Sequence, residues 1–329
     1  MKYITKKRIG LLVVMLLTFT LVAACGKESG GEVSGKGVKM YLTVSSADAF
    51  RTSLIEQAKK TAEEIGATLD VHDAEGSLEN QLAQIREAVD GGYDVILCNP
   101  VDVDTALQLQ VEAGDLPIVF YNSCPDDSRL EADKYVYVGS NEEEAGRYQA
   151  EYILEKFSSK DTIHVAIIEG ELQHSATIGR TKALKNTLND SGKTINYVFV
   201  DTADWDKDKA KSLYELFLKT GQEIDCVASN NDTMALGVVE ACREKGVDFA
   251  KFPVLGVDAT ADGCKSIEDG EMQFTVYQSA VGQGEYAVKA AAALAQGQSL
   301  KGMKYLSDDE KYVWVPFEKV DASNVKKYK

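Results

Sequence analysis

The side chains of this sequence that could do chemistry are polar groups that follow short apolar runs, with two aromatic side chains among them. Most are Asn, Asp, Gln, His or Arg, and the aromatic ones are Phe50 and Trp205. They fall in residues 45–51, 99–102, 169–176, 201–206 and 230–232, and at Asn122, Asp258 and Gln278. Carboxylates and amides can bridge neighbouring hydroxyls, and an Arg fork donates several hydrogen bonds. An aromatic face can cover the apolar face of a ring. The combination predicts reversible binding of a sugar.

The stretch 227–241 shows how such groups would be positioned. An apolar run suited to a buried strand ends at residue 228, a polar turn follows, and apolar residues then recur at helical spacing. Asn230, Asn231 and Asp232 form the turn, and three such groups exceed what a helix cap needs, although capping alone is the simpler alternative. We interpret Asn231, directly after the strand, as a ligand contact. Asn230 and Asp232 are interpreted as turn and helix-cap residues.

Strands and helices alternate from residue 38 onward. Strands are expected at 38–44, 68–71, 94–98, 117–121, 135–138, 163–168, 195–200, 225–228, 253–257, 274–277 and 312–315. Helical patterns occupy the intervals and end with an Ala-rich helix at 280–295. Apolar strands alternating with helices specify parallel sheets covered on both faces. The predicted fold class is therefore α/β, with two similar doubly wound parallel-sheet lobes. Ligands of such sheets bind at the carboxyl ends of the strands, which here would face a cleft between the lobes.

The first 24 residues have the pattern of a secretory signal peptide. Four basic residues precede the apolar run 9–24, which is short for a membrane span. The run ends in Val22-Ala23-Ala24-Cys25, which resembles a bacterial lipobox and implies cleavage before Cys25 and lipidation of its sulfur. An uncleaved membrane helix is the alternative. Residues 25–37 then comprise the lipidated Cys and a flexible tether rich in Gly and Ser. This pattern predicts an extracytoplasmic protein anchored to the cell membrane by lipid.

Charge and cysteine content exclude several classes of function. The chain has 36 Lys and Arg against 52 Asp and Glu, and loss of the four basic residues of the signal leaves a net charge of −20. Such a surface repels nucleic acid and anionic lipid headgroups. Five cysteines remain after Cys25, and we interpret them as core residues rather than a disulfide framework. Whether Cys98 and Cys124 approach each other is left open.

Six segments together resemble one known family. They are IVFYNSCP (118–125), YVYVGSNEEEAG (135–146), DTADWDKDKAK (201–211), SNNDTMALGVVEA (229–241), FPVLGVDA (252–259) and FTVYQ (274–278). In this order they resemble the type I periplasmic solute-binding proteins of ABC sugar importers, most closely the galactose/glucose-binding branch. The resemblance covers residues 38–316. It implies a non-enzymatic, monomeric protein that captures a monosaccharide and delivers it to an ABC permease, without a cofactor.

The resemblance also implies roles for individual residues. Phe50 and Trp205 would sandwich the sugar ring. The residues that would hydrogen-bond the sugar are Asp48, Asn122, His174, Arg180, Asn231, Asp258 and Gln278. Arg51 is expected to be a solvated or rim residue, with contact to the ligand as the alternative. Residues 142–144 are expected to form a solvated first helical turn.

The sequence departs from the galactose/glucose branch at three places. The family's Asp two residues after the site His is Ala176 here, and its last site amide, an Asn, is Gln278. The segment 158–161 is too short for the family's calcium loop. Acidic residues at 204, 206, 208 and 215 fall on an EF-hand spacing, but Lys209 replaces the required Gly. No metal site is expected, and the sugar could differ from galactose or glucose.

The resemblance implies a three-stranded hinge between the lobes. Residues 38–140 plus 278–310 would form the N-terminal lobe, and residues 141–277 plus 311–329 the C-terminal lobe. The chain would cross near residues 139–140, 277–278 and 310. Because predicted ligand contacts come from both lobes, a bound sugar would stabilise the closed state.

Two other classes of function fit parts of the pattern. A sugar-sensing module that presents its closed form to a membrane sensor kinase or chemoreceptor would need the same two lobes. A secreted sugar-acting enzyme would need an acid and a nucleophile, and no pair of carboxylates stands out in these roles. Related transcriptional repressors carry an N-terminal DNA-binding helix-turn-helix, where this chain has a signal peptide.

Overall fold

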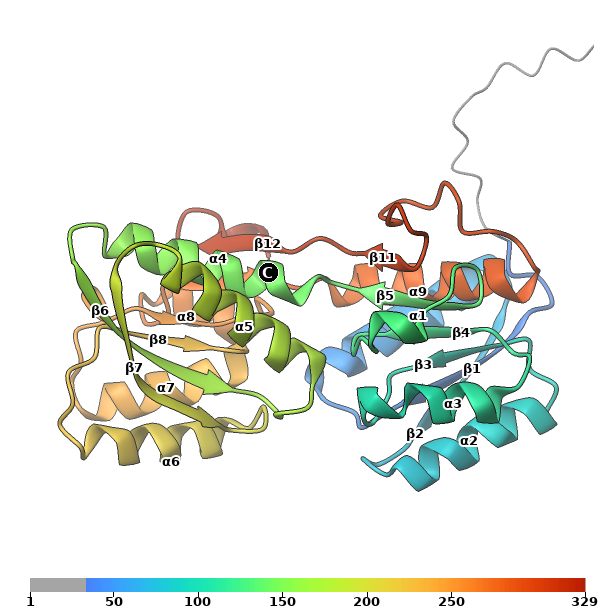
Figure 1. Cartoon of the computed structure of the whole chain (residues 1–329), viewed down its shortest axis with the longest axis horizontal. Coiled ribbons are helices and arrows are strands. Elements are labelled where there is room, and N and C mark those ends of the chain that lie inside the picture. The colour runs from blue at the N-terminus through green and yellow to red at the C-terminus, as the bar shows by residue number, and fades with distance from the viewer. Residues whose placement is uncertain (1–33, 329) are drawn as a thin grey trace, which may run out of the picture. The chain divides into compact units, whose positions relative to one another are not determined.

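A computed structural model describes residues 34–328, in which two six-stranded sheets form the centres of two lobes (Figure 1). The first sheet has the order β11-β5-β4-β3-β1-β2 and is parallel throughout. Its strands are β1 (Lys39–Val44), β2 (Thr68–Asp73), β3 (Val95–Cys98), β4 (Ile118–Tyr121), β5 (Tyr135–Gly139) and β11 (Tyr312–Trp314). The α/β fold class with two parallel-sheet lobes is confirmed. The predicted signal peptide, Cys25 and most of the tether lie outside the described residues.

The second sheet has the order β12-β10-β9-β8-β6-β7, the same pattern with one antiparallel edge. Its strands are β6 (Thr162–Glu169), β7 (Thr194–Thr202), β8 (Cys226–Ser229), β9 (Val254–Leu255), β10 (Phe274–Tyr277) and β12 (Glu318–Asp321). The strand β12 was not predicted, because its polar sequence lacks the apolar run of a central strand. Its edge position requires burial of only one side chain, Val320.

Helices cover both faces of each sheet because alternate strand residues face opposite sides. In β1, Met40 and Leu42 pack against α1 (Ala49–Ile65) and α9 (Ala280–Ala295). Tyr41 faces the other side, with α2 (Leu78–Asp90) and α3 (Ala106–Ala113). The second sheet is covered by α4 (Glu142–Lys156) and α5 (Ser175–Asn189) on one face, and by α6 (Lys207–Leu218), α7 (Asp232–Glu244) and α8 (Ala261–Glu268) on the other (Figure 1). Single 3-10 turns are η1 (Val103–Thr105), η2 (Asp127–Arg129) and η3 (Val325–Lys327).

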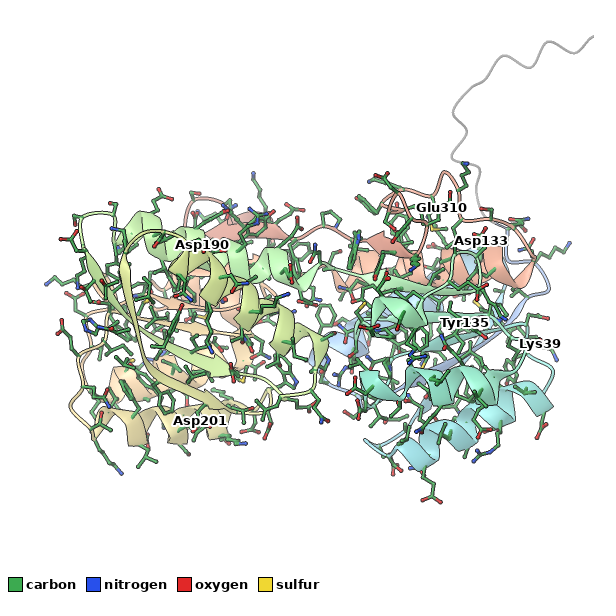
Figure 2. All side chains as sticks on the ribbon, in the orientation of Figure 1. Lys39, Asp133, Tyr135, Asp190, Asp201 and Glu310 are labelled. Carbon is green, nitrogen blue, oxygen red and sulfur yellow. The ribbon has the colours of Figure 1, made fainter. Side chains whose placement is uncertain are left out.

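The strand β11 differs from its expected place, because it belongs to the first sheet rather than to the C-terminal lobe. It pairs with β5, and Val315 N–H still donates to the carbonyl of Gly139. The aromatic side chains of β11 pack on the first lobe, and the ring centroids of Trp314 and Tyr137 lie 5.6 Å apart. The third crossing therefore follows Trp314, and Glu310 lies in the turn that precedes β11 (Figure 2). The sequence alone does not show which sheet this short strand joins.

The described helices and cysteines add two findings. Within residues 34–328, every helix is too short or too polar to cross a membrane. Cys98 and Cys124 remain thiols and do not form a disulfide with each other. Cys98 is fully buried at the end of β3, which fits its interpretation as a core residue.

The packing of α9 on α1 depends on Gly284. A Cβ atom at this position would lie 2.4 Å from the carbonyl oxygen of Leu54, a backbone atom that cannot move aside alone. Gly282, in the same helix, would place a Cβ 2.9 Å from side-chain atoms of Ser279 and Val315. The close approach of the two helices is thus specific to Gly284.

We predict that Gly284→Ala lowers the free energy of unfolding by about 2 kcal/mol or more, because α9 must shift away from α1. Gly282→Ala is the matched control in the same helix, with a smaller loss expected. Urea unfolding followed by circular dichroism measures both. Equal stability of the Gly284→Ala variant and the wild type would contradict the proposed contact.

Candidate functional site

One pocket of about 210 Å³ collects all nine predicted ligand contacts. They are Asp48, Phe50, Asn122, His174, Arg180, Trp205, Asn231, Asp258 and Gln278. Ala49, Arg51, Ala176, Thr233 and Thr260 complete the lining. Most of these residues follow the carboxyl ends of β1, β4, β6, β7, β8, β9 and β10, as the parallel topology requires. Of the predicted segment 99–102, Asn99 is buried in hydrogen bonds with Ser45, and Val101 lines an adjoining pocket that shares His174.

Arg180 is bonded through all three nitrogen atoms of its guanidinium group. Its Nε donates to Glu142 Oε2 at 2.6 Å, and its Nη1 donates to the carbonyl of Asn230 at 2.6 Å. Its Nη2 donates to Gln278 Oε1 at 3.0 Å. Asp258 Oδ1 lies 3.9 Å from Nη1. The guanidinium is buried, so its donors are held in fixed directions toward the pocket wall.

Glu142 contradicts the prediction of a solvated first turn. It is buried, and its carboxylate accepts from Arg180, whereas Glu143 is exposed as expected. Burial raises the pKa of Glu142, and the charge of Arg180 opposes this rise. The sequence pattern at Glu142 is the acidic N-terminus of α4. This pattern does not distinguish a buried carboxylate from a solvated one, because acidic residues are typical of solvated helix starts. The partner, 38 residues away, is visible only in the fold.

Asp258 reaches the pocket from a strained backbone. Its φ is 114°, in the region that favours glycine, and Ala259 follows with a φ of 52°. The backbone N–H of Asp258 donates to Val276 at 2.7 Å, which ties the turn to β10. Burial raises the pKa of Asp258 well above its usual range, while Arg180 lowers it. The carboxyl group thus lies at the pocket wall, 3.9 Å from Nη1 of Arg180 and with little exposure to solvent.

Asp232 holds this turn from behind the pocket, which corrects its interpretation as a helix-cap residue. Its Oδ2 accepts from the backbone N–H of Thr260 at 2.8 Å, and its Oδ1 accepts from the Thr275 hydroxyl at 2.6 Å. A Cβ at Gly256 would lie 2.1 Å from Oδ1, so the carboxyl group fits against bare backbone. Burial raises its pKa to about 7.

Three of the predicted ligand contacts are also helix N-caps. Asp48 Oδ1 accepts from Arg51 N at 2.7 Å, Asn231 Oδ1 from Met234 N at 2.9 Å, and His174 Nδ1 from Ala176 N at 3.1 Å. Asn231 is therefore the cap of α7, the role that the sequence analysis gave to its neighbours, and it lines the pocket as well. Asn230 is buried and bonds Gly170 and Thr181.

The two aromatic side chains lie at the pocket as predicted. Trp205 is half-buried with a φ of 64°, and its indole packs on Gly170, where a Cβ would lie 2.2 Å away. Its ring meets His174 edge-on, with centroids 5.3 Å apart. Phe50 is half-buried against the core of the first lobe and lines the pocket. Phe50 therefore packs on the core of the first lobe and also faces the pocket.

Arg51 also lines the pocket, although the sequence favoured a place at the rim. It is 5% exposed rather than at a solvated rim, and its Nη1 donates to the carbonyl of Ser46 at 3.0 Å. Its Nε donates to Asn122 Oδ1 at 3.4 Å. Its position three residues after the N-cap Asp48 predicts the ion pair that the two residues form, but not the burial of the guanidinium.

Two of the four acidic residues on the EF-hand spacing have structural roles. Asp206 is the N-cap of α6, and Asp204 forms an ion pair with Lys209. A separate group of His164, Glu223 and Asp225 has the ligand types of a cation site. The ammonium group of Lys160 contacts Asp225 there, so a positive charge already neutralises the buried carboxylate.

Comparison with known proteins identifies relatives along most of the chain. The model of a periplasmic binding protein domain matches residues 40–299. A putative rhizopine-binding protein of Rhizobium meliloti is 31% identical over 287 residues, which cover 85% of this chain and 89% of that protein. The D-galactose/methyl-galactoside binding periplasmic protein of Haemophilus influenzae is 28% identical over 328 residues, covering 94% and 97%. A solute binding protein of an ABC transporter from Bacillus halodurans, solved with bound myo-inositol, is 30% identical with a TM-score of 0.78, covering 91% and 98%.

The chain therefore belongs to the periplasmic binding protein family, with the type I fold. The relatives are substrate-binding proteins rather than enzymes, as the sequence analysis predicted.

We predict that Asp232 makes the stability of the protein depend on pH. Its pKa is raised from 3.8 to about 7 in the folded state, so the folded protein binds this proton more tightly than the unfolded chain does. The resulting stabilisation is complete below about pH 4 and is lost as the pH rises through about 7. Relative to the Asp232→Asn variant, the free energy of unfolding of the wild type should fall by about 2 kcal/mol between pH 5 and pH 7.

Urea unfolding of both proteins at pH 5, 6, 7 and 8 measures this difference. The variant is the control, because Glu142 and Asp258 contribute their own pH dependence to both curves. Parallel curves over the whole range would show that Asp232 is not the titrating group.

Proposed function

We propose that this protein captures a monosaccharide or a similar polyhydroxylated ring outside the cytoplasm and delivers it to an ABC permease. The observation that carries the proposal is the composition of the pocket, in which fixed donors and acceptors alternate beside two aromatic rings. Arg180 offers hydrogen-bond donors, and Asp258 offers a carboxyl group. Asn231 offers an amide that can both donate and accept hydrogen bonds. A ring with several hydroxyls satisfies all three types of group at once. The relatives named above bear names or bound ligands of this chemical kind.

Closure of the two lobes would couple ligand binding to delivery. Asp48, Phe50 and Asn122 come from the first lobe, and His174, Trp205 and Asn231 from the second. Direct contacts also cross the cleft: Cys124 N–H donates to Ser175 Oγ at 2.9 Å. A ligand that contacts both lobes stabilises the closed form by its differential affinity, and the permease would recognise that form.

The identity of the ring is narrowed by Ala176 and Gln278. Ala176 removes a carboxylate that the galactose/glucose branch places beside the sugar, and the neighbouring His174 keeps its capping role without it. The site therefore favours a substituted sugar, an alternative sugar or a cyclitol over free galactose. A thermal-shift screen of residues 37–329 against pentoses, hexoses, deoxy sugars, alditols and myo-inositol tests this preference. A clear preference for plain galactose or glucose would contradict it.

We predict that Trp205→Ala and Asp258→Ala each weaken binding of the best ligand at least tenfold, about 1.4 kcal/mol. The first variant removes the aromatic face, and the second removes the carboxyl group beside Arg180. Isothermal titration calorimetry measures the affinities. Leu216→Ala and Asp208→Ala, exposed positions of α6, are matched controls with unchanged affinity expected. Wild-type affinity in both pocket variants would refute the site assignment.

We further propose that Cys25 carries the lipid that anchors the protein. The residues Val22-Ala23-Ala24-Cys25 are the basis of this proposal, and the Gly- and Ser-rich tether gives the binding lobes reach from the membrane. The Cys25→Ser variant is expected to lose incorporation of labelled fatty acid and to move from the membrane fraction to the soluble fraction. Unchanged labelling would place the lipid elsewhere or exclude it, and the single variant Cys124→Ser serves as the control.

A further inference from the structure

His174 and Arg51 form an unsatisfied contact across the cleft. Arg51 Nη2 lies 3.3 Å from His174 Nε2, and Ala176 N–H points at His174 Nδ1 from 3.1 Å. Burial, with the nearby charges of Arg51 and Arg180, lowers the pKa of His174 to about 3, so the imidazole is neutral. A neutral imidazole has one acceptor nitrogen and one N–H donor. Two donors are therefore directed at a ring that can accept only one.

The backbone fixes which donor the ring accepts. Ala176 N–H belongs to the first turn of α5 and has no partner within the helix, so it requires His174 Nδ1 as its acceptor. The ring proton is then on Nε2, and it faces Arg51 Nη2, which can donate hydrogen bonds but cannot accept one. Two donors at 3.3 Å do not form a hydrogen bond with each other. Each needs an acceptor from the cleft.

Arg51 is held so that Nη2 is the donor it presents to the cleft. Nε is directed at Asn122, and Nη1 at Ser46 and Asp48, all in the first lobe. His174 caps α5 in the second lobe. The two donors thus come from opposite lobes and converge on one point of the pocket.

We propose that one ligand oxygen accepts hydrogen bonds from both Arg51 Nη2 and His174 Nε2, and that Arg51 is therefore a specificity-determining residue. The inference rests on the proposed function. Arg51 is paired with Asp48, and Arg180 is paired with Glu142 and lies near Asp258, so neither guanidinium has a positive charge left over for an anion. The bridging oxygen accordingly belongs to a neutral hydroxyl. Asp48, whose Oδ2 lies 3.4 Å from Arg51 Nη1, lines the same wall and can accept the proton of that hydroxyl.

The experiment measures affinity by calorimetry for the wild type and for Arg51→Met, with myo-inositol, D-galactose and the monodeoxy analogues of each as probes. The Arg51→Met change removes the donor and keeps a long side chain in place. We expect at least a tenfold loss with the better-bound parent ring. One monodeoxy analogue should bind the wild type at least tenfold more weakly than the parent ring does. The affinity of that analogue should be the same for the wild type and for the Arg51→Met variant. Non-additivity of this kind identifies the hydroxyl that Arg51 binds.

Control variants separate this role from a structural one. Arg86→Met removes an ion pair with Glu112 on the surface of the same lobe and should leave affinity unchanged. Arg51→Lys keeps the positive charge but loses the forked donors of the guanidinium group. The affinity of the same monodeoxy analogue should be unchanged by this substitution. Melting curves without ligand verify that each variant folds.

Each outcome bears on one of the two proposals. Wild-type affinity in Arg51→Met, or losses that add for every monodeoxy analogue, would overturn the role of Arg51 and leave the proposed function intact. If the wild type binds none of the probes and none of the rings in the broader screen, the proposed function itself is overturned, and this inference with it.

Discussion

The buried guanidinium of Arg180 is the interaction on which the site depends. It joins Glu142, at the start of α4, to Gln278, directly after β10, and it also bonds the carbonyl of Asn230. Glu142 and Gln278 each lie within three residues of a point where the chain passes between the lobes, at Gly139 and Tyr277. Loss of one partner of a buried ion pair typically costs about 3–5 kcal/mol, because the other charge stays buried without compensation. The geometry of the pocket and that of the hinge are therefore set by the same group.

The cost of burying these charges explains why the surrounding residues are so constrained. Asp258 adopts a backbone conformation that favours glycine, and Asp232 fills a space left by the absence of side chains at Gly256 and Gly263. Polar groups removed from water are stable only when each is hydrogen-bonded. Asp232 meets this condition through hydrogen bonds from Thr260 and Thr275, behind the wall of the pocket. The rigidity of the ligand-facing surface thus depends on residues that lie behind it.

Much of this arrangement was predictable from the sequence, and the remainder depended on contacts between distant segments. Apolar runs located most of the strands, and the carboxyl ends of parallel strands meet at one edge of each sheet, which placed Asn231 and Asp258 together in the second lobe. The burial of Arg51, Glu142 and Asp232 was not predictable, because each lies in a local pattern that is equally typical of exposed helix starts. Their partners are contributed by other strands and helices. The side of the hinge to which β11 belongs was equally hidden, since three residues carry no signal about which neighbour they join.

The double use of Asp48, Asn231 and His174 has a consequence for how such proteins diversify. One atom of each side chain is committed to the first turn of a helix, while another faces the cavity. Ser, Thr, Asn and Asp cap helices with comparable strength, so exchanges among them alter the chemistry offered to a ligand at little cost in stability. Chains of this architecture can therefore change what they recognise one residue at a time while the scaffold persists. Ligand specificity can therefore change while the fold is kept, and sequence similarity along the whole chain is a poor guide to which small molecule binds in the pocket.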